Sequence, residues 1–141
     1  MLIGKRGFGV AGVCVALLAV TACGVFGSPA APHVTEDQLT GAWAGDCGAG
    51  LDVSEDHTFT AKDFPVDFKG VGTKPELVSG SGTWRLARAV EGVSPQELSL
   101  YLGDRGFDLE VRGSAEEIQL HWSVGDPDYA YHCKFTAKPV K

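Results

Sequence analysis

The feature that most constrains this chain is an alternation of apolar and polar residues that begins near Leu39 and continues almost to the C-terminus. Segments 107–112, 117–124 and 129–135 each place an apolar residue at every second position. A period of two is typical of β-strands with one buried and one wet face, and no stretch shows a convincing helical period of 3.6 residues. The sequence therefore predicts an all-β fold built from short strands.

The connections between these segments predict the strand order. Gly-Asp-Arg-Gly at 103–106 and Gly-Asp-Pro-Asp at 125–128 are four-residue connections of the kind that join antiparallel hairpins. Seven to eight strands in this order form an antiparallel meander, which hides its edges most simply by closing into a barrel. A two-sheet sandwich is the alternative. Pro65 cannot donate to a strand ladder, so segment 64–68 is expected at an edge or in a loop.

Closure into a barrel would turn one apolar face of every strand inward. The interior of a small eight-stranded barrel is either filled by these side chains or keeps room for one small ligand. The bulky residues expected inside are Trp43, Phe59, Trp84, Leu86, Leu98, Leu100, Phe107, Leu109, Trp122, Tyr131 and Phe135.

The N-terminal region has a different character. Lys5 and Arg6 precede the apolar residues 7–22, a run shorter than the roughly 20 residues that a spanning helix needs. This arrangement predicts a secretion signal over residues 1–22, with an uncleaved membrane anchor as the alternative. Residues 23–38 are rich in Gly, Ala and Pro and are expected to form a flexible linker, which leaves residues 39–141 as the folded domain.

The end of the signal carries a short motif. Val20-Thr21-Ala22-Cys23 resembles the lipobox of bacterial lipoproteins, in which an aliphatic residue and two small residues precede a cysteine. The resemblance implies that the signal is cut before Cys23 and that the Cys23 sulfur carries a diacylglycerol. The protein would then be held by this lipid at the outer face of the bacterial cytoplasmic membrane. An ordinary secreted protein with an incidental cysteine is the alternative.

A second motif opens the expected domain. Gly41-Ala42-Trp43 resembles the start of lipocalin-like and avidin-like barrels, where a Gly-x-Trp begins the first strand and the tryptophan plugs one end. The last expected strand offers no arginine to pack on this tryptophan, as lipocalins often do. No set of biotin-type polar ligands lines the inward positions either. The resemblance therefore implies a lipocalin-like fold and no particular ligand.

Charge and cysteine content narrow the classes of partner. Removal of residues 1–22 leaves 10 of the 12 basic residues against 18 acidic ones, a formal net charge of −8. Nucleic-acid-binding proteins present basic patches, so no nucleic-acid partner is expected. Export leads to an oxidising compartment, which predicts a disulfide between Cys47 and Cys133, with two free buried thiols as the alternative.

Two candidate sites follow from the barrel. Trp43, Trp84, Trp122 and Tyr131 are candidates for lining an apolar ligand pocket near a barrel mouth, with segment 64–82 as its lid. The alternative is a barrel whose core is filled by side chains.

The second candidate site is a pair of histidines. If the turn at 125–128 sets Val124 opposite Tyr129, His121 faces His132 on the outer surface. Two imidazoles so placed could hold Zn²⁺ or Cu²⁺, although the sequence names no third ligand. A solvent-exposed pair without a metal is the alternative.

The residues suggest a binding or interaction module that takes a small apolar ligand or a protein partner. A scaffold or inhibitor domain with a filled core is one alternative, and a metal-dependent hydrolase is another. The spacing of Ser, His and acidic residues assembles no catalytic set, and no phosphate-binding glycine motif opens a helix. No catalytic residue and no cofactor are therefore predicted.

Overall fold

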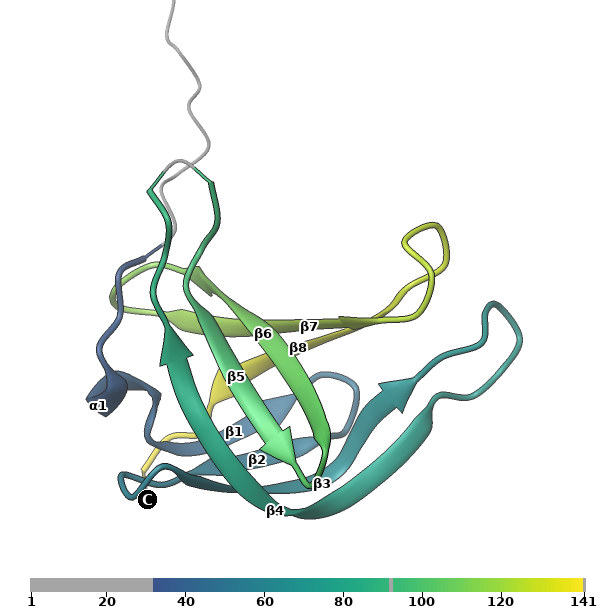
Figure 1. Cartoon of the computed structure of the whole chain (residues 1–141), viewed down its shortest axis with the longest axis horizontal. Helices are drawn as coiled ribbons and strands as arrows, with labels where there is room; N and C mark the ends of the chain where they lie inside the picture. The colour runs from purple at the N-terminus through teal and green to yellow at the C-terminus, as the bar shows by residue number, and fades with distance from the viewer. Residues whose placement is uncertain (1–31, 92, 141) are drawn as a thin grey trace, which may run out of the picture.

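The computed structural model describes residues 32–91 and 93–140 (Figure 1). The predicted signal over residues 1–22 and the predicted lipid site at Cys23 lie outside the described residues. No helix in the described part of the chain is long and apolar enough to cross a bilayer. One short helix precedes eight strands: α1 (Glu36–Leu39), β1 (Gly41–Gly45), β2 (Gly50–Val53), β3 (Thr58–Asp67), β4 (Glu76–Ala87), β5 (Glu97–Leu102), β6 (Arg105–Gly113), β7 (Ile118–Val124) and β8 (Tyr131–Ala137).

The strands form a closed antiparallel barrel in sequence order. The seam joins the first strand to the last, with Trp43 opposite Ala137 and Gly45 opposite Phe135. The predicted barrel is therefore confirmed, and the sandwich alternative is wrong. Inward positions pack into one apolar core, as the alternation predicts, and Leu98, Leu100 and the other core residues are almost fully buried.

An up-and-down barrel has two ends with different turns. The end that we call the N-terminal end carries α1, the last described residues, and the β2–β3, β4–β5 and β6–β7 connections. The other end, which we call the far end, carries the β1–β2, β3–β4, β5–β6 and β7–β8 connections. In Figure 1, the β3–β4 and β7–β8 loops project together away from α1.

The folded part begins before residue 39. Val34 and Leu39 are 1% and 0% exposed and belong to the core. The buried Gln96 side chain accepts a hydrogen bond from Val34 N at 2.6 Å and donates one to Val34 O at 3.1 Å. Residues 34–38, expected in the linker, are therefore bound to the barrel by contacts 62 residues apart in sequence.

Strand β3 contradicts the expectation that segment 64–68 lies at an edge or in a loop. Phe64, Pro65 and Val66 are buried inside a ten-residue strand. Ala61 pairs with Gly80 and Phe64 with Val78, so β3 contains an extra residue between these pairs. A second irregularity follows between Pro65 and Asp67, where Val66 is an extra residue. Pro65 thus lies between two interruptions of the ladder, which explains how a proline is accommodated in this strand.

Two hairpins also differ from the expected ones. Leu102 pairs with Arg105, so the β5–β6 turn has two residues, Gly103 and Asp104, rather than four. The β7–β8 connection has six residues, 125–130, because Val124 pairs with Tyr131. Tyr129, expected on the inward face of the last strand, lies in this loop and is 60% exposed. Segment 64–82, expected to be a lid, forms most of the β3–β4 hairpin instead.

Candidate functional site

The barrel interior is occupied by stacked aromatic side chains. Phe64 lies 5.5–6.0 Å, between ring centroids, from Phe107, Trp122 and Phe135. Phe107 meets Trp122 edge to face at 5.7 Å. The bulge in β3 makes this packing possible, because the inward positions change from the odd numbers 59 and 61 to the even numbers 64 and 66. The predicted apolar interior is thus a packed core where these four aromatic rings meet.

The three tryptophans proposed as ligand contacts have their indole donors engaged by the protein itself. Trp43 Nε1 donates to the carbonyl of Leu39 at 2.9 Å and Trp84 Nε1 to that of Ser54 at 2.8 Å. Trp122 Nε1 donates to the Pro65 carbonyl at 2.6 Å. Each indole thereby fixes a neighbouring turn, helix or strand. No buried side-chain nitrogen or oxygen among the described residues lacks a hydrogen-bond partner.

These candidate residues are spread along the barrel. Trp43 and Trp84 are buried near the N-terminal end, where the half-exposed His57 ring lies 4.9 Å from Trp84 and pairs with Glu36 at 3.1 Å. Tyr131 begins β8 near the far end and packs on Phe68 at 5.5 Å between ring centroids. The structure therefore does not bring the four predicted residues together around one cavity.

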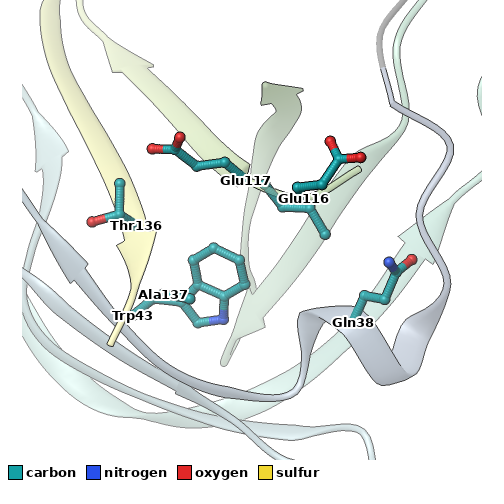
Figure 2. Close-up of a pocket in the computed structure, with 7 residues that line it drawn as sticks. Gln38, Trp43, Glu116, Glu117, Thr136 and Ala137 are labelled. Atoms are coloured by element: carbon teal, nitrogen blue, oxygen red, sulfur yellow. The ribbon is translucent and has the colours of Figure 1, made fainter. Parts of the chain in front are cut away.

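A shallow hollow of about 410 Å³ lies at the N-terminal end. Figure 2 shows the Trp43 indole between α1 and β8, with the carboxylates of Glu116 and Glu117 on the opposite side of the hollow. Gln38, Ile118, Thr136 and Ala137 complete the lining. Since Trp43 is only 2% exposed, the hollow gives a ligand little aromatic surface to contact.

The histidine pair is not formed as predicted. His121 lies opposite Lys134, and His132 lies opposite Ser123, so the register differs by two residues from the predicted one. The His132 Nδ1 atom is 2.7 Å from the Ser123 hydroxyl, and the His121 Nε2 atom is 3.0 Å from the Gln119 amide oxygen. Facing imidazoles, on which the metal hypothesis depended, are therefore absent from the β7–β8 pair.

His121 has a perturbed protonation equilibrium. Partial burial, followed by the nearby charges of Arg112 and Lys134, lowers the pKa of the His121 imidazole from its ordinary value of 6.5. The neutral ring is therefore favoured in the folded protein.

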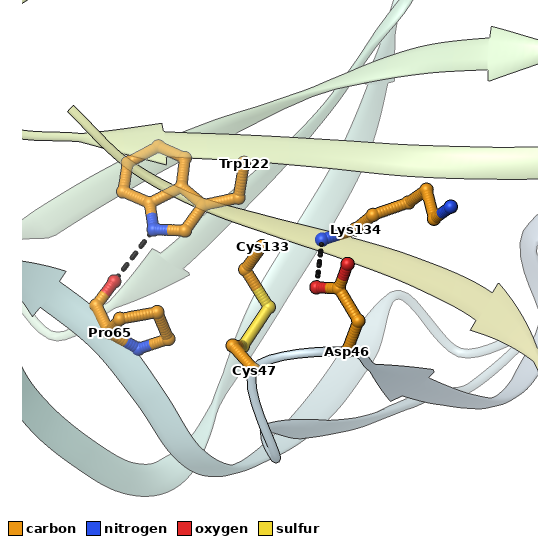
Figure 3. The surroundings of a disulfide bond; sticks show 6 residues. All are labelled: Asp46, Cys47, Pro65, Trp122, Cys133 and Lys134. Carbon is orange, nitrogen blue, oxygen red and sulfur yellow. Dashed lines mark hydrogen bonds between the residues drawn. A yellow bond between two sulfur atoms is a disulfide. The ribbon is translucent and has the colours of Figure 1, made fainter.

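The cysteines are joined as predicted. Cys47, in the β1–β2 connection, forms a disulfide with Cys133 of β8, with 5.3 Å between the Cα atoms (Figure 3). The adjacent Asp46 carboxylate accepts a hydrogen bond from Lys134 N at 2.9 Å. Asp46 and the two sulfur atoms lie close together, but sulfur atoms in a disulfide are not thiolates and so are not available as metal ligands.

The far end presents exposed apolar side chains, which the sequence did not predict to form a site together. Val71 is 82% exposed, Tyr129 60% and Leu77 52%. Val71 and Tyr129 lie in the β3–β4 and β7–β8 loops, and Leu77 lies near the start of β4. The ring of Phe68, in the β3–β4 loop, contacts the ring of Tyr131 at the start of β8. We call Phe68, Val71, Leu77, Tyr129 and Tyr131 the far-end rim. The lengths of the two loops are the signal that could have predicted the far-end rim. An apolar residue in a long loop lies on no strand face that the core could bury, so it is expected to be exposed.

The loops of the far-end rim also differ in charge. Lys69 and Lys74 lie in the β3–β4 loop, whereas Asp126 and Asp128 lie in the β7–β8 loop. A second small hollow, of about 180 Å³, lies at the base of the β3–β4 loop.

Comparison with protein-family models, with curated proteins and with solved structures finds no match for this chain.

Proposed function

We propose that this protein is an exported lipoprotein, held by lipid on Cys23 at the outer face of the bacterial cytoplasmic membrane, whose barrel is an interaction module for a protein partner. The observation that carries the choice of a protein partner is the packed interior. Phe64, Phe107, Trp122 and Phe135 occupy the space that a carrier barrel would keep for its ligand. A protein partner would then bind to the outer surface and the loops of the barrel.

The far-end rim is the surface best suited to this role. Exposed aromatic side chains such as Tyr129 are enriched at protein interfaces, and the fully buried centre of an interface is more apolar than the rest of the protein surface. Lysines on one loop and aspartates on the other give the rim a polar border of both signs. The Phe68–Tyr131 contact holds the base of the β3–β4 loop against the start of β8, so less conformational entropy is lost there when a partner binds.

Two further features support export and anchoring. The Cys47–Cys133 disulfide suits a protein that resides in an oxidising compartment. The net charge of −8 after removal of residues 1–22 suits a domain kept off anionic lipid headgroups and attached by a tether. The second candidate function is a scaffold domain without a binding surface, which the same filled core allows.

Photo-crosslinking in cells of the organism that encodes the chain separates these functions. A photoreactive amino acid at position 129, on the rim, is compared with one at position 101 on the barrel wall, where Tyr101 is 37% exposed. The proposal predicts a discrete adduct at 129 that Val71→Asp weakens, and none at 101. Equal adducts at both positions, or none at either, would favour the scaffold.

Anchoring is tested separately from partner binding. Cys23→Ala is expected to move the domain from the membrane fraction to the soluble fraction or to block its processing. Unchanged membrane retention of this variant would refute the lipid anchor without affecting the argument for the rim.

A further inference from the structure

The two loops at the far end carry opposite charges that the chain does not pair. Lys69 and Lys74 are exposed in the β3–β4 loop, and Asp126 and Asp128 are exposed in the β7–β8 loop. Among residues 32–91 and 93–140, none of these four side chains takes part in an ion pair. The Asp126 carboxylate accepts a hydrogen bond from the Asp128 amide at 2.9 Å, so it also shapes its own turn. We call these segments the lysine loop and the aspartate loop.

The bases of the two loops are held side by side. Gly125, at the start of the aspartate loop, lies against Phe68: a Cβ added to Gly125 would come within 3.0 Å of the Phe68 carbonyl oxygen. One level deeper in the barrel, Trp122 Nε1 donates to the Pro65 carbonyl at 2.6 Å (Figure 3). The positive and the negative loop therefore have a fixed order on one surface.

Strand β4 presents free backbone at the same end. Strand β5 pairs with β4 only from Thr83 onward, and within the described chain β3 alone is paired with residues 76–82. Lysine or proline commonly protects such an edge, but residues 77–84 contain no charge and no proline. Glu76, just before them, is 3.7 Å from Arg105 of its own chain. The edge is therefore open to a partner that lies on the far-end rim.

We propose that the partner of the far-end rim is a second copy of this chain, bound rim to rim about a two-fold axis. This inference rests on the proposed function and deepens it, because it names the partner of the same surface. A two-fold axis between the loops sets the lysine loop of each copy against the aspartate loop of the other, so the attractive contact forms twice. The same rotation brings Val71, Leu77 and Tyr129 of both copies together, where they leave water.

The anchor makes a small interface sufficient. Copies that carry lipid on Cys23 share one membrane surface, which raises their effective concentration. About ten residues separate Cys23 from His33, and an extended chain of that length reaches at most about 35 Å. Two barrels can therefore lie along the bilayer with their rims facing each other. Because the charges are exposed, salt should weaken this association.

Charge exchange between the loops tests the pairing. An acidic variant, Lys69→Glu/Lys74→Glu, carries negative charge on both loops. A basic variant, Asp126→Asn/Asp128→Lys, carries positive charge on both, and the asparagine keeps the side-chain oxygen that accepts the amide hydrogen at position 128. The inference predicts that neither variant pairs with itself, whereas the two variants pair with each other.

The assay uses mature, lipidated protein in phosphatidylcholine vesicles, with a photoreactive amino acid at position 129 and two different tags on two preparations. The wild-type mixture is expected to give an adduct that carries both tags. Each charge variant alone should lower its yield about tenfold, and the mixture of the two variants should restore it. The matched control is Lys62→Glu/Lys134→Glu, which makes the same change of charge at exposed positions on the barrel wall and should leave the yield unchanged.

Three results would overturn the inference. An adduct that neither charge variant weakens, or that the wall control weakens equally, would be a product of crowding on the vesicle. No two-tag adduct in vesicles, together with a discrete adduct to a different protein in cells, would reject the second copy and leave the protein-binding rim intact. No adduct from position 129 in vesicles or in cells would reject the inference and the proposed function together.

Discussion

The disulfide offers the most quantitative prediction, because it closes the barrel seam between chain segments far apart in sequence. Cys47 and Cys133 are 86 residues apart. In the chain-entropy treatment, a loop of this length restricts the unfolded chain by about 4.5 kcal/mol, although measured values are often smaller. Cys133 is also 1% exposed, so deleting its sulfur leaves a small void that costs about 1 kcal/mol. We expect Cys47→Ala/Cys133→Ala to lose between about 3 and 5 kcal/mol.

The assay is equilibrium unfolding in urea, which gives the free energy of unfolding and the denaturant slope m separately. A crosslink keeps the unfolded chain compact, so its removal must raise m as well as lower stability. The matched control is Leu109→Ala, which keeps the disulfide and removes a fully buried side chain. That variant is expected to lose about 2–5 kcal/mol with m unchanged.

Two results would contradict this reasoning. A loss below about 1 kcal/mol in the double variant would mean that the disulfide contributes little to the stability of the barrel. A loss of the expected size with the wild-type m would attribute the effect to packing around Cys133 and not to the unfolded chain.

Three further substitutions test separate contacts. Gln96→Ala leaves the Val34 amide and carbonyl unpaired, so it is expected to cost about 2 kcal/mol and to speed hydrogen exchange at Val34, read by NMR; unchanged exchange would contradict this. Trp122→Phe leaves the Pro65 carbonyl without its donor and is expected to lose about 1–3 kcal/mol in urea unfolding, whereas wild-type stability would show that the bond contributes nothing. Burial lowers the pKa of His121, so the unfolded chain binds the extra proton and stability is lost as pH falls through about 6.5. His121→Gln should flatten urea-unfolding stability between neutral and mildly acidic pH, and an unaltered pH profile would refute this.

The sequence predicted the barrel because its main signal, the period of two, is local. Each strand must bury one face, and the turns join neighbouring strands, so closure needed little long-range information. The disulfide was predictable for a related reason. Two cysteines near the ends of the expected domain meet when the first and last strands pair, and the register of β1 with β8 brings them together.

The register of β7 with β8 could not be fixed in the same way. A shift of two residues keeps every side chain on its face, so the alternation favours neither pairing. The six-residue loop that contains Tyr129 decides between them, and it separates His121 from His132. The hypothesis of a metal site between His121 and His132 therefore depended on the length assumed for the β7–β8 turn.

The bulge in β3 was not predicted, although the pattern of apolar residues in this segment indicates it. Phe59 and Ala61 are inward at odd positions, whereas Phe64 and Val66 are inward at even ones. When the inward positions of one strand change from odd to even numbers, the strand contains an extra residue. Because Pro65 was expected to exclude this segment from the sheet interior, the extra residue was not predicted. Helix α1 is too short to show a period, and its signal is instead a capping box, in which Thr35 N donates to the Gln38 side chain at 2.9 Å.

The packed interior is the claim on which the assignment to protein recognition depends, and xenon binding followed by NMR tests it most directly. Xenon enters dry apolar cavities, and an engineered cavity in Leu109→Ala supplies a positive control. A packed interior predicts saturable methyl shifts on xenon addition to Leu109→Ala and only weak, non-saturable shifts in the wild-type barrel. Saturable shifts around Phe64 and Trp122 in the wild-type protein would show an interior cavity and contradict the proposal of a filled core.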